Sequence, residues 1–169
     1  MSAAVQVSLE EYLSTTYEHD CDYVDGEVID RGMPDWDHSA TQGSLVGYLA
    51  NRRKQMGIRV HPEQRIRIGP TRTRVVDVCC PDEDAPREPV IVTPPLVCVE
   101  ILSPDDRFEA TTAKIEDYLK ICVPCVWVIN PRTRHAWIHT SDGSRSVRDG
   151  VLRTPDGRIE VPLAELFEA

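Results

Sequence analysis

The stretch LVCVEIL, residues 96–102, decides the fold of this 169-residue chain. Five of its seven residues are apolar and a sixth is cysteine, a composition typical of a strand that is buried on both faces of a sheet. Glu100 interrupts this run near its centre. An ionised carboxylate in an apolar environment is destabilising by several kcal/mol unless it is paired or bound to a metal. We therefore expect Glu100 either to have a cationic partner or to bind a metal ion.

A second apolar strand, RVVDVCC (residues 74–80), is interrupted in the same way by Asp77. Side chains alternate between the two faces of a strand, so Asp77 shares a face with Val75 and Cys79, and Glu100 shares a face with Cys98 and Leu102. If the two strands pair side by side, the two carboxylates converge. Carboxylate oxygens of this kind suit Mg²⁺ or Mn²⁺.

Lys114 lies near the start of the next helix predicted by the sequence, residues 112–122, and could reach back towards the sheet. Two carboxylates and a lysine can bind a divalent ion, orient a water molecule and attack a phosphodiester. The spacing also allows a purely structural interpretation, in which Asp77 and Glu100 are strand-end residues with solvated heads and Lys114 is a surface charge.

The composition is that of an ordinary globular protein, which we expect to be cytosolic, with one domain over residues 1–169. There are 19 basic and 28 acidic residues, a net charge of −9, and no apolar run of membrane-spanning length. This charge argues against coating of nucleic acid by bulk attraction but allows a local basic groove. Without a secretory signal we expect no disulfide framework, and we expect the Cys122–Cys125 CxxC to be packing residues.

The periodicity of the chain predicts an α/β fold, a mixed sheet with helices and a small C-terminal β-meander. The capping box Ser8–Glu11 begins a short helix, and the apolar stripe of a long helix follows the loop that contains His38. The remaining segments are a strand pair at 23–30, a helix at 39–56, a hairpin at 58–70, a buried strand at 126–131, an edge strand at 135–140, turns at 142–143, 149–150 and 156–157, and a terminal helix at 161–169.

In this order, the segments resemble the Uma-two family of endonucleases, within the PD-(D/E)XK restriction-endonuclease-like superfamily. The resemblance covers residues 9–167 and is carried by YVDGE (23–27), His38, VVD (75–77), VEILSP (99–104), Lys114 with Tyr118, and VPCVWVINP (123–131). It implies a restriction-endonuclease-like mixed sheet flanked by helices, and Mg²⁺-dependent hydrolysis of nucleic acid, with Mn²⁺ as a substitute. It also implies residue roles: Asp77 and Glu100 as metal ligands, Lys114 as the catalytic lysine, and Glu27 and His38 as accessory site residues.

One position departs from the superfamily pattern, which has a lysine two residues after the glutamate, where this chain has Leu102. The resemblance implies that Lys114 supplies the amine from the helix instead.

The alternative function is that of a nuclease-fold binding module, which acts in a protein assembly with little or no hydrolysis. The net charge of −9 favours this alternative. The expected partner is nucleic acid, with DNA the first expectation although the residues leave RNA open. A homodimer is expected from the need for two sites to cut a duplex.

Four arginines precede Asp77, and they have two interpretations: a phosphate-binding rim beside the metal, or a solvated hairpin face that balances an acidic protein. They are Arg65, Arg67, Arg72 and Arg74.

The two strand carboxylates should repel each other when no metal is bound. At about 5 Å and an effective dielectric constant of about 20, the repulsion is roughly 3 kcal/mol. Neutralising either Asp77 or Glu100 should then leave the metal-free protein at least as stable as wild type. If Glu100 were instead paired with an arginine such as Arg74, the same change would be strongly destabilising.

Overall fold

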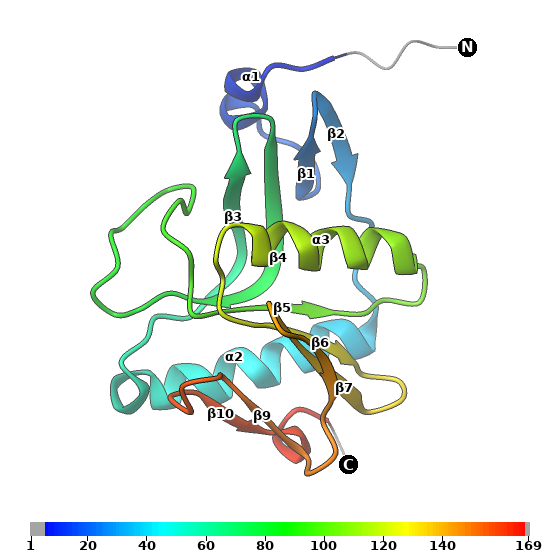
Figure 1. Cartoon of the computed structure of the whole chain (residues 1–169). Coiled ribbons are helices and arrows are strands. Elements are labelled where there is room, and N and C mark those ends of the chain that lie inside the picture. Colours follow the sequence, from blue (N-terminus) through cyan, green and yellow to red (C-terminus); the bar gives the residue numbers. More distant parts are fainter. Residues whose placement is uncertain (1–5, 168–169) are drawn as a thin grey trace.

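The structure, a computed structural model, describes residues 6–167, and its centre is a mixed sheet (Figure 1). The strand order is β2-β1-β4-β5-β6-β7-β8, and β3 pairs with β4 outside this path. The strands are β1 Cys21–Val24, β2 Glu27–Asp30, β3 His61–Gly69, β4 Arg72–Cys80, β5 Val97–Ile101, β6 Val126–Asn130, β7 His135–Thr140 and β8 Gly143–Ser146. The helices are α1 Leu9–Ser14, α2 Trp36–Met56 and α3 Phe108–Lys120, with a 3₁₀ turn at Leu163–Glu165.

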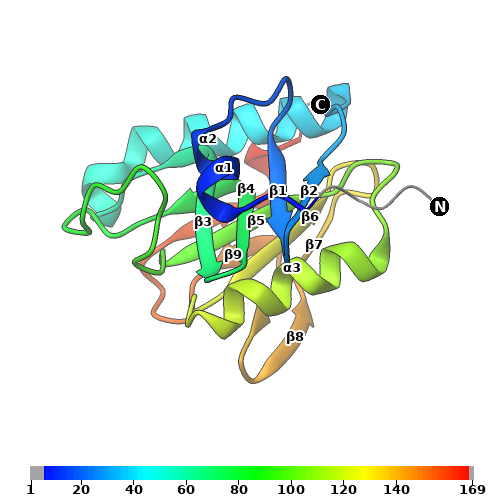
Figure 2. The same cartoon turned by 90° about the horizontal axis from the view of Figure 1, so that it is seen from above.

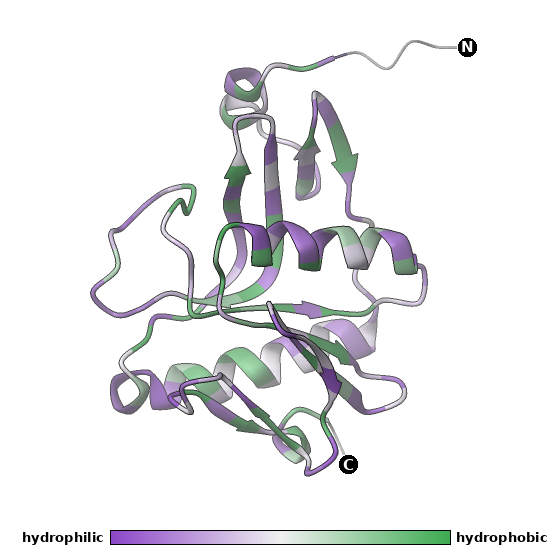
Figure 3. Ribbon diagram, viewed as in Figure 1, coloured by the Kyte–Doolittle hydropathy of each residue, from purple (hydrophilic) through white to green (hydrophobic). Residues whose placement is uncertain are grey.

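Helices α2 and α3 cover opposite faces of the sheet, as the view from above shows (Figure 2). Leu45 of α2 packs in one core cluster with Val97 and Val99 of β5. Tyr118 of α3 packs in a second cluster with Cys98, which lies between those two valines in the strand. The apolar run of β5 is therefore buried on both faces, and the ribbon coloured by hydropathy shows it as mostly hydrophobic (Figure 3). The predicted α/β fold class is confirmed.

The order of the central strands brings Asp77 and Glu100 together. β4 and β5 are antiparallel, with Val78 opposite Val99 and Cys79 opposite Cys98. Continuing this register by one residue places Asp77 opposite Glu100, as the predicted side-by-side pairing requires. β5 and β6 are parallel, and α3 is the crossover that a parallel pair needs. The helix that carries Lys114 is thereby placed over β5.

The two long helices begin earlier than the sequence predicts. The Asp35 side chain accepts a hydrogen bond from the backbone N–H of His38 and caps α2, which therefore starts at Trp36 and not at residue 39. His38 lies in the first turn. α3 starts at Phe108 and not at residue 112, without a side-chain cap at Arg107.

Three predictions for strands and helices need correction. Residues 58–70 do not form a hairpin of their own, since β3 is a single strand whose hairpin partner is β4. β7 is not an edge strand, because β6 and β8 flank it, and β8 is exposed along its length. The segment predicted as a terminal helix is strand followed by the 3₁₀ turn, as far as residue 167.

The C-terminal turns divide between two sheets. The Asp142–Gly143 turn joins β7 to β8 in the main sheet. The later turns border a separate two-stranded sheet of β9 Val151–Arg153 and β10 Glu160–Pro162. Among residues 6–167, no helix is sufficiently long and apolar to cross a membrane.

Two glycines of the α2 region give a matched test of this fold. Gly47 lies mid-helix with open space where a Cβ would project, so Gly47→Ala should stabilise the protein by about 0.5–1 kcal/mol. Gly57 ends the helix at φ 63°, where a Cβ would lie 2.7 Å from Arg158 Nη2, so Gly57→Ala should cost at least about 1–2 kcal/mol. Urea denaturation of both variants checks these signs, and equal effects would contradict this description of α2.

Candidate metal and active site

Asp77 is almost fully buried and its two carboxylate oxygens have separate donors. The Ile101 backbone N–H donates to Oδ2 at 2.7 Å, and the Arg31 guanidinium donates to Oδ1. His38 Nε2 lies 3.3 Å from Oδ2. Burial acts to raise the pKa of Asp77, but the hydrogen bond from His38 and the charge of Arg31 outweigh it and hold the pKa below its ordinary value. Asp77 is therefore ionised at neutral pH.

Glu100, which is 5% exposed, has partners that both come from α3. Lys114 Nζ donates to Oε2 at 3.0 Å, and the Tyr118 hydroxyl donates to Oε1 at 2.7 Å. Burial raises the pKa of Glu100 to about 7; the nearby Lys114 opposes this shift and the charge of Asp77 adds to it. The pKa values of the two carboxylates are therefore shifted in opposite directions, although the two residues lie on neighbouring strands.

Lys114 reaches the sheet as the sequence predicts. Besides Glu100, its ammonium lies 4.0 Å from Asp22 Oδ2. Burial alone would lower the pKa of Lys114, but Glu100 and Asp22 raise it above its ordinary value. Lys114 is thus a fixed cation at neutral pH, suited to stabilise negative charge and not to accept a proton.

His38 is buried beside Asp77, and its position follows from the Asp35 cap that sets the first turn of α2. Nε2 faces Asp77, while Nδ1 is buried without a hydrogen-bond partner. Burial lowers the pKa of His38, but the hydrogen bond to Asp77 raises it above its ordinary value. The structure brings His38 into the cluster, as the resemblance implies.

A chain of buried ion pairs that the sequence did not reveal lies behind Lys114. Asp22 of β1 accepts the Val75 backbone N–H at 2.8 Å, and it accepts Arg74 Nη1 at 3.0 Å. Arg74 Nε in turn donates to Asp117 Oδ2 of α3 at 2.7 Å. The only local sequence signal for either residue is its position beside a segment of the predicted site. Asp22 directly precedes the YVDGE segment, and Asp117 lies one helical turn after Lys114.

The structure does not place the four predicted phosphate-binding arginines on one face. Arg65 and Arg67 of β3 pair with Val75 and Thr73 of β4, whereas Arg74 pairs with Ile66, so alternation sends Arg74 to the other face. All four have acceptors within the protein: Leu13 O for Arg65, Gly69 O for Arg67, Asp25 and Asp117 for Arg72, and Asp22 and Asp117 for Arg74. The prediction of a single arginine rim is wrong in its geometry.

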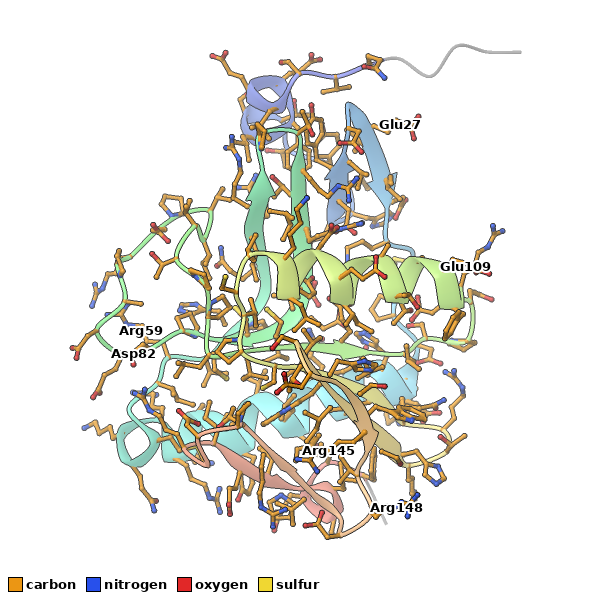
Figure 4. The ribbon with its side chains drawn as sticks, in the orientation of Figure 1. Glu27, Arg59, Asp82, Glu109, Arg145 and Arg148 are labelled. Atoms are coloured by element: carbon orange, nitrogen blue, oxygen red, sulfur yellow. The ribbon has the colours of Figure 1, made fainter. Side chains whose placement is uncertain are left out.

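Glu27 is also placed away from the cluster. It is exposed at the first position of β2, and Figure 4 shows it at the outer end of the β1–β2 hairpin, pointing away from the rest of the molecule. The same hairpin instead contributes Asp22, and the chain after it contributes Arg31. The predicted accessory role of Glu27 therefore has no support in its position.

A cavity of about 340 Å³ opens onto this cluster, lined among others by Asp22, Arg31, His38, Asp77, Glu100 and Lys114. Within residues 6–167, no group of three or more His, Cys, Asp or Glu side chains is arranged to hold a metal ion. Two carboxylates nevertheless suit Mg²⁺, which keeps several of its waters and often binds one or two protein carboxylates.

The buried carboxylates around the cavity are matched in number by basic side chains. Four buried carboxylates, Asp22, Asp77, Glu100 and Asp117, contact four basic side chains, Arg31, Arg72, Arg74 and Lys114. A divalent cation at Asp77 and Glu100 would therefore compete with Arg31 and Lys114 for these carboxylates.

Comparison with known proteins agrees with the fold. A family model, Uma2, described as "Putative restriction endonuclease", matches residues 9–167. The chain belongs to the Uma2 family. No curated protein matches it. A solved structure is similar to it: the crystal structure of a putative nuclease belonging to DUF820 from Anabaena variabilis, which is 24% identical and superposes with a TM-score of 0.83, covering 95% of this chain and 97% of that chain.

The geometry changes one expectation about the two carboxylates. At neutral pH, without metal, Asp77→Asn should destabilise the protein by roughly 2–4 kcal/mol, because it removes the charged partner of the largely buried Arg31.

Glu100→Gln should be neutral or stabilising. Since burial raises the folded-state pKa of Glu100 to about 7, wild type should lose stability relative to Glu100→Gln as pH rises from about 4.5 to about 7, by roughly 2–3 kcal/mol in all.

Urea denaturation in EDTA at several pH values measures both effects. Equal behaviour of the two variants, as expected from simple repulsion, would contradict these assignments.

The arginine assignments can be tested in the same way. Arg74→Met leaves Asp22 and Asp117 without their shared buried partner and should cost about 2–4 kcal/mol. Arg153→Met, whose partners Asp149 and Glu160 are exposed, is the matched control and should have no measurable effect. If Arg74→Met is as stable as the control, Arg74 is free for another role.

Proposed function

We propose that this chain is a metal-dependent nuclease that hydrolyses phosphodiester bonds in nucleic acid, with Asp77 and Glu100 as ligands of Mg²⁺ or Mn²⁺. The observation that carries the proposal is the 3.0 Å contact between Lys114 Nζ and Glu100 Oε2. Leu102 occupies the strand position at which the superfamily has its lysine, yet an amine reaches the same carboxylate from α3. The carboxylate pair and the lysine are thus assembled, although their sequence spacing is unusual. The family description supports the same reaction class.

A divalent ion bound to Asp77 and Glu100 would polarise a phosphoryl oxygen and lower the pKa of a bound water. The remaining tasks fall to side chains of this chain. Lys114, held protonated, stabilises negative charge that develops on the phosphoryl oxygens and orients the attacking water. His38, buried beside Asp77, holds that carboxylate through Nε2.

The supporting residues fix the orientation of these groups. Tyr118 donates to Glu100 Oε1, which limits rotation of the carboxylate. The Asp117–Arg74–Asp22 ion pairs tie α3 to β4 and β1, and so hold the helix that carries Lys114 at a defined distance from the sheet. Such positioning is necessary because small displacements of catalytic groups strongly reduce the rate.

A second candidate function has its own support. Both carboxylates already face basic groups, Asp77 facing Arg31 and Glu100 facing Lys114, and the chain has a net charge of −9. These features favour a nuclease-fold binding module that acts in a protein assembly with little or no hydrolysis. The two candidates differ in affinity for Mg²⁺ or Mn²⁺, which the binding module should lack. Under the nuclease proposal, the protein acts in the cytoplasm and DNA is the first substrate to test. Cleavage of both strands would favour a homodimer.

An activity assay distinguishes the two. The full chain is incubated with single- and double-stranded DNA and RNA in Mn²⁺, beside Lys114→Ala and the exposed control Lys54→Ala. Lys114→Ala should lower the cleavage rate by roughly 100-fold or more, as loss of a charge-stabilising donor does in other enzymes. Lys54→Ala should match wild type. If wild type cuts none of the four substrates faster than Lys114→Ala, the binding module is the better description.

A further inference from the structure

Arg31 is the basic residue most closely associated with Asp77. It follows β2, and its guanidinium forms a bridge, with Nη2 on Asp77 Oδ1 and Nη1 2.5 Å from Glu63 Oε2. The side chain is only 14% exposed, and Nε is buried without a hydrogen-bond partner. Nothing in the nuclease chemistry derived above uses this cation, although it contacts a proposed metal ligand.

The Arg31–Asp77 pair also stands between two cavities. The cavity of about 340 Å³ that contains Glu100 and Lys114 shares four lining residues with a second cavity of about 440 Å³. The shared residues are Arg31, His38, Asp77 and Ser103. The ion pair therefore forms part of the wall that separates the two halves of this cleft.

Of the donors on Asp77, Arg31 is the one whose positive charge does not depend on pH. The Ile101 N–H is neutral and His38 titrates, whereas a guanidinium stays protonated in proteins. A cation that binds Asp77 must therefore compete with Arg31, since two positive groups on one carboxylate repel each other.

Glu63 provides a second site for the same guanidinium. Its side chain is 37% exposed, and it accepts Gln42 Nε2 at 2.6 Å, while the same nitrogen donates to the Asp77 main-chain oxygen at 2.9 Å. Glu63 is thus tied to β4 beside the site. Arg31 can release Asp77 and keep a carboxylate partner at the edge of the cleft.

We propose that Arg31 is the resident counter-cation of Asp77: it neutralises this carboxylate in the metal-free protein, and a divalent ion displaces it onto Glu63. This inference rests on the proposed function, because it requires Asp77 to be a metal ligand. Arg31 acts here as a positioning residue. Its removal from Asp77 opens the wall between the two cavities. Its competition with the metal reduces the apparent metal affinity to the intrinsic affinity multiplied by the fraction of molecules in which Arg31 has released Asp77.

The test is calorimetric titration of the full chain with Mn²⁺ alone, without nucleic acid. Arg31→Met, which keeps much of the side-chain length without the charge, should bind Mn²⁺ at least about tenfold more tightly than wild type. Arg52→Met is the matched control, because it removes one positive charge from the α2 surface, where Arg52 packs on the Tyr48 ring. Its Mn²⁺ affinity should equal that of wild type.

A purely structural Arg31 gives the opposite sign, since loss of the bridge would loosen Asp77 and weaken Mn²⁺ binding. Weaker or unchanged binding by Arg31→Met, or equal tightening in Arg52→Met, overturns the inference. If Arg31→Met does not fold, Arg31→Lys decides: its ammonium lacks the rigid fork that holds Asp77 and Glu63 at two fixed contacts, so it should hold Asp77 less firmly and its Mn²⁺ affinity should exceed that of wild type.

The outcomes separate this inference from the proposed function. If neither wild type nor Arg31→Met binds Mn²⁺, the metal site is absent and both proposals fail. If wild type binds Mn²⁺ and Arg31→Met binds no more tightly, the proposed function stands and only the role of Arg31 is rejected.

Discussion

The buried charge of Glu100 is the constraint on which the rest of the structure depends. A carboxylate at the centre of a sheet covered on both faces must be neutralised from one of the covering layers. Both donors, Lys114 and Tyr118, come from α3. The same helix is the crossover between the parallel strands β5 and β6, so the topology that closes the sheet also delivers the ammonium and hydroxyl that the carboxylate needs.

The ion pairs behind Lys114 follow from the same constraint. Replacing a buried ion pair with apolar side chains is often neutral or stabilising, so such pairs are weak evidence for stability alone. Here Asp22, Arg74 and Asp117 join β1, β4 and α3 through directional ion pairs, which fix the position of the helix more narrowly than non-directional apolar contacts would. This arrangement departs from simple core packing next to the candidate site, which is where such departures are expected.

The electrostatics of the cluster shift the pKa values of Asp77 and Glu100 in opposite directions. Arg31 and His38 keep Asp77 ionised, while burial and the charge of Asp77 raise the pKa of Glu100 towards neutrality. Two neighbouring acids with pKa values separated by their surroundings are a common arrangement in active sites. In this protein the separation comes from His38 and Arg31, which lower the pKa of Asp77, and from the burial of Glu100, which Lys114 offsets only in part.

The sequence by itself determined most of the elements and the three residues at the centre of the candidate site. Apolar periodicity predicted the buried strands with Asp77 and Glu100, and helical spacing predicted that Lys114 could return to the sheet, because these patterns are local. Only the tertiary structure decided that Asp22 and Arg31 belong to the cluster, that Glu27 does not, and that the arginines are divided between two faces. The ion pairs of Arg31 and Arg74 join residues 32 to 52 positions apart in sequence. Strand pairing and register bring such partners together, and neither can be read from the period of a single strand.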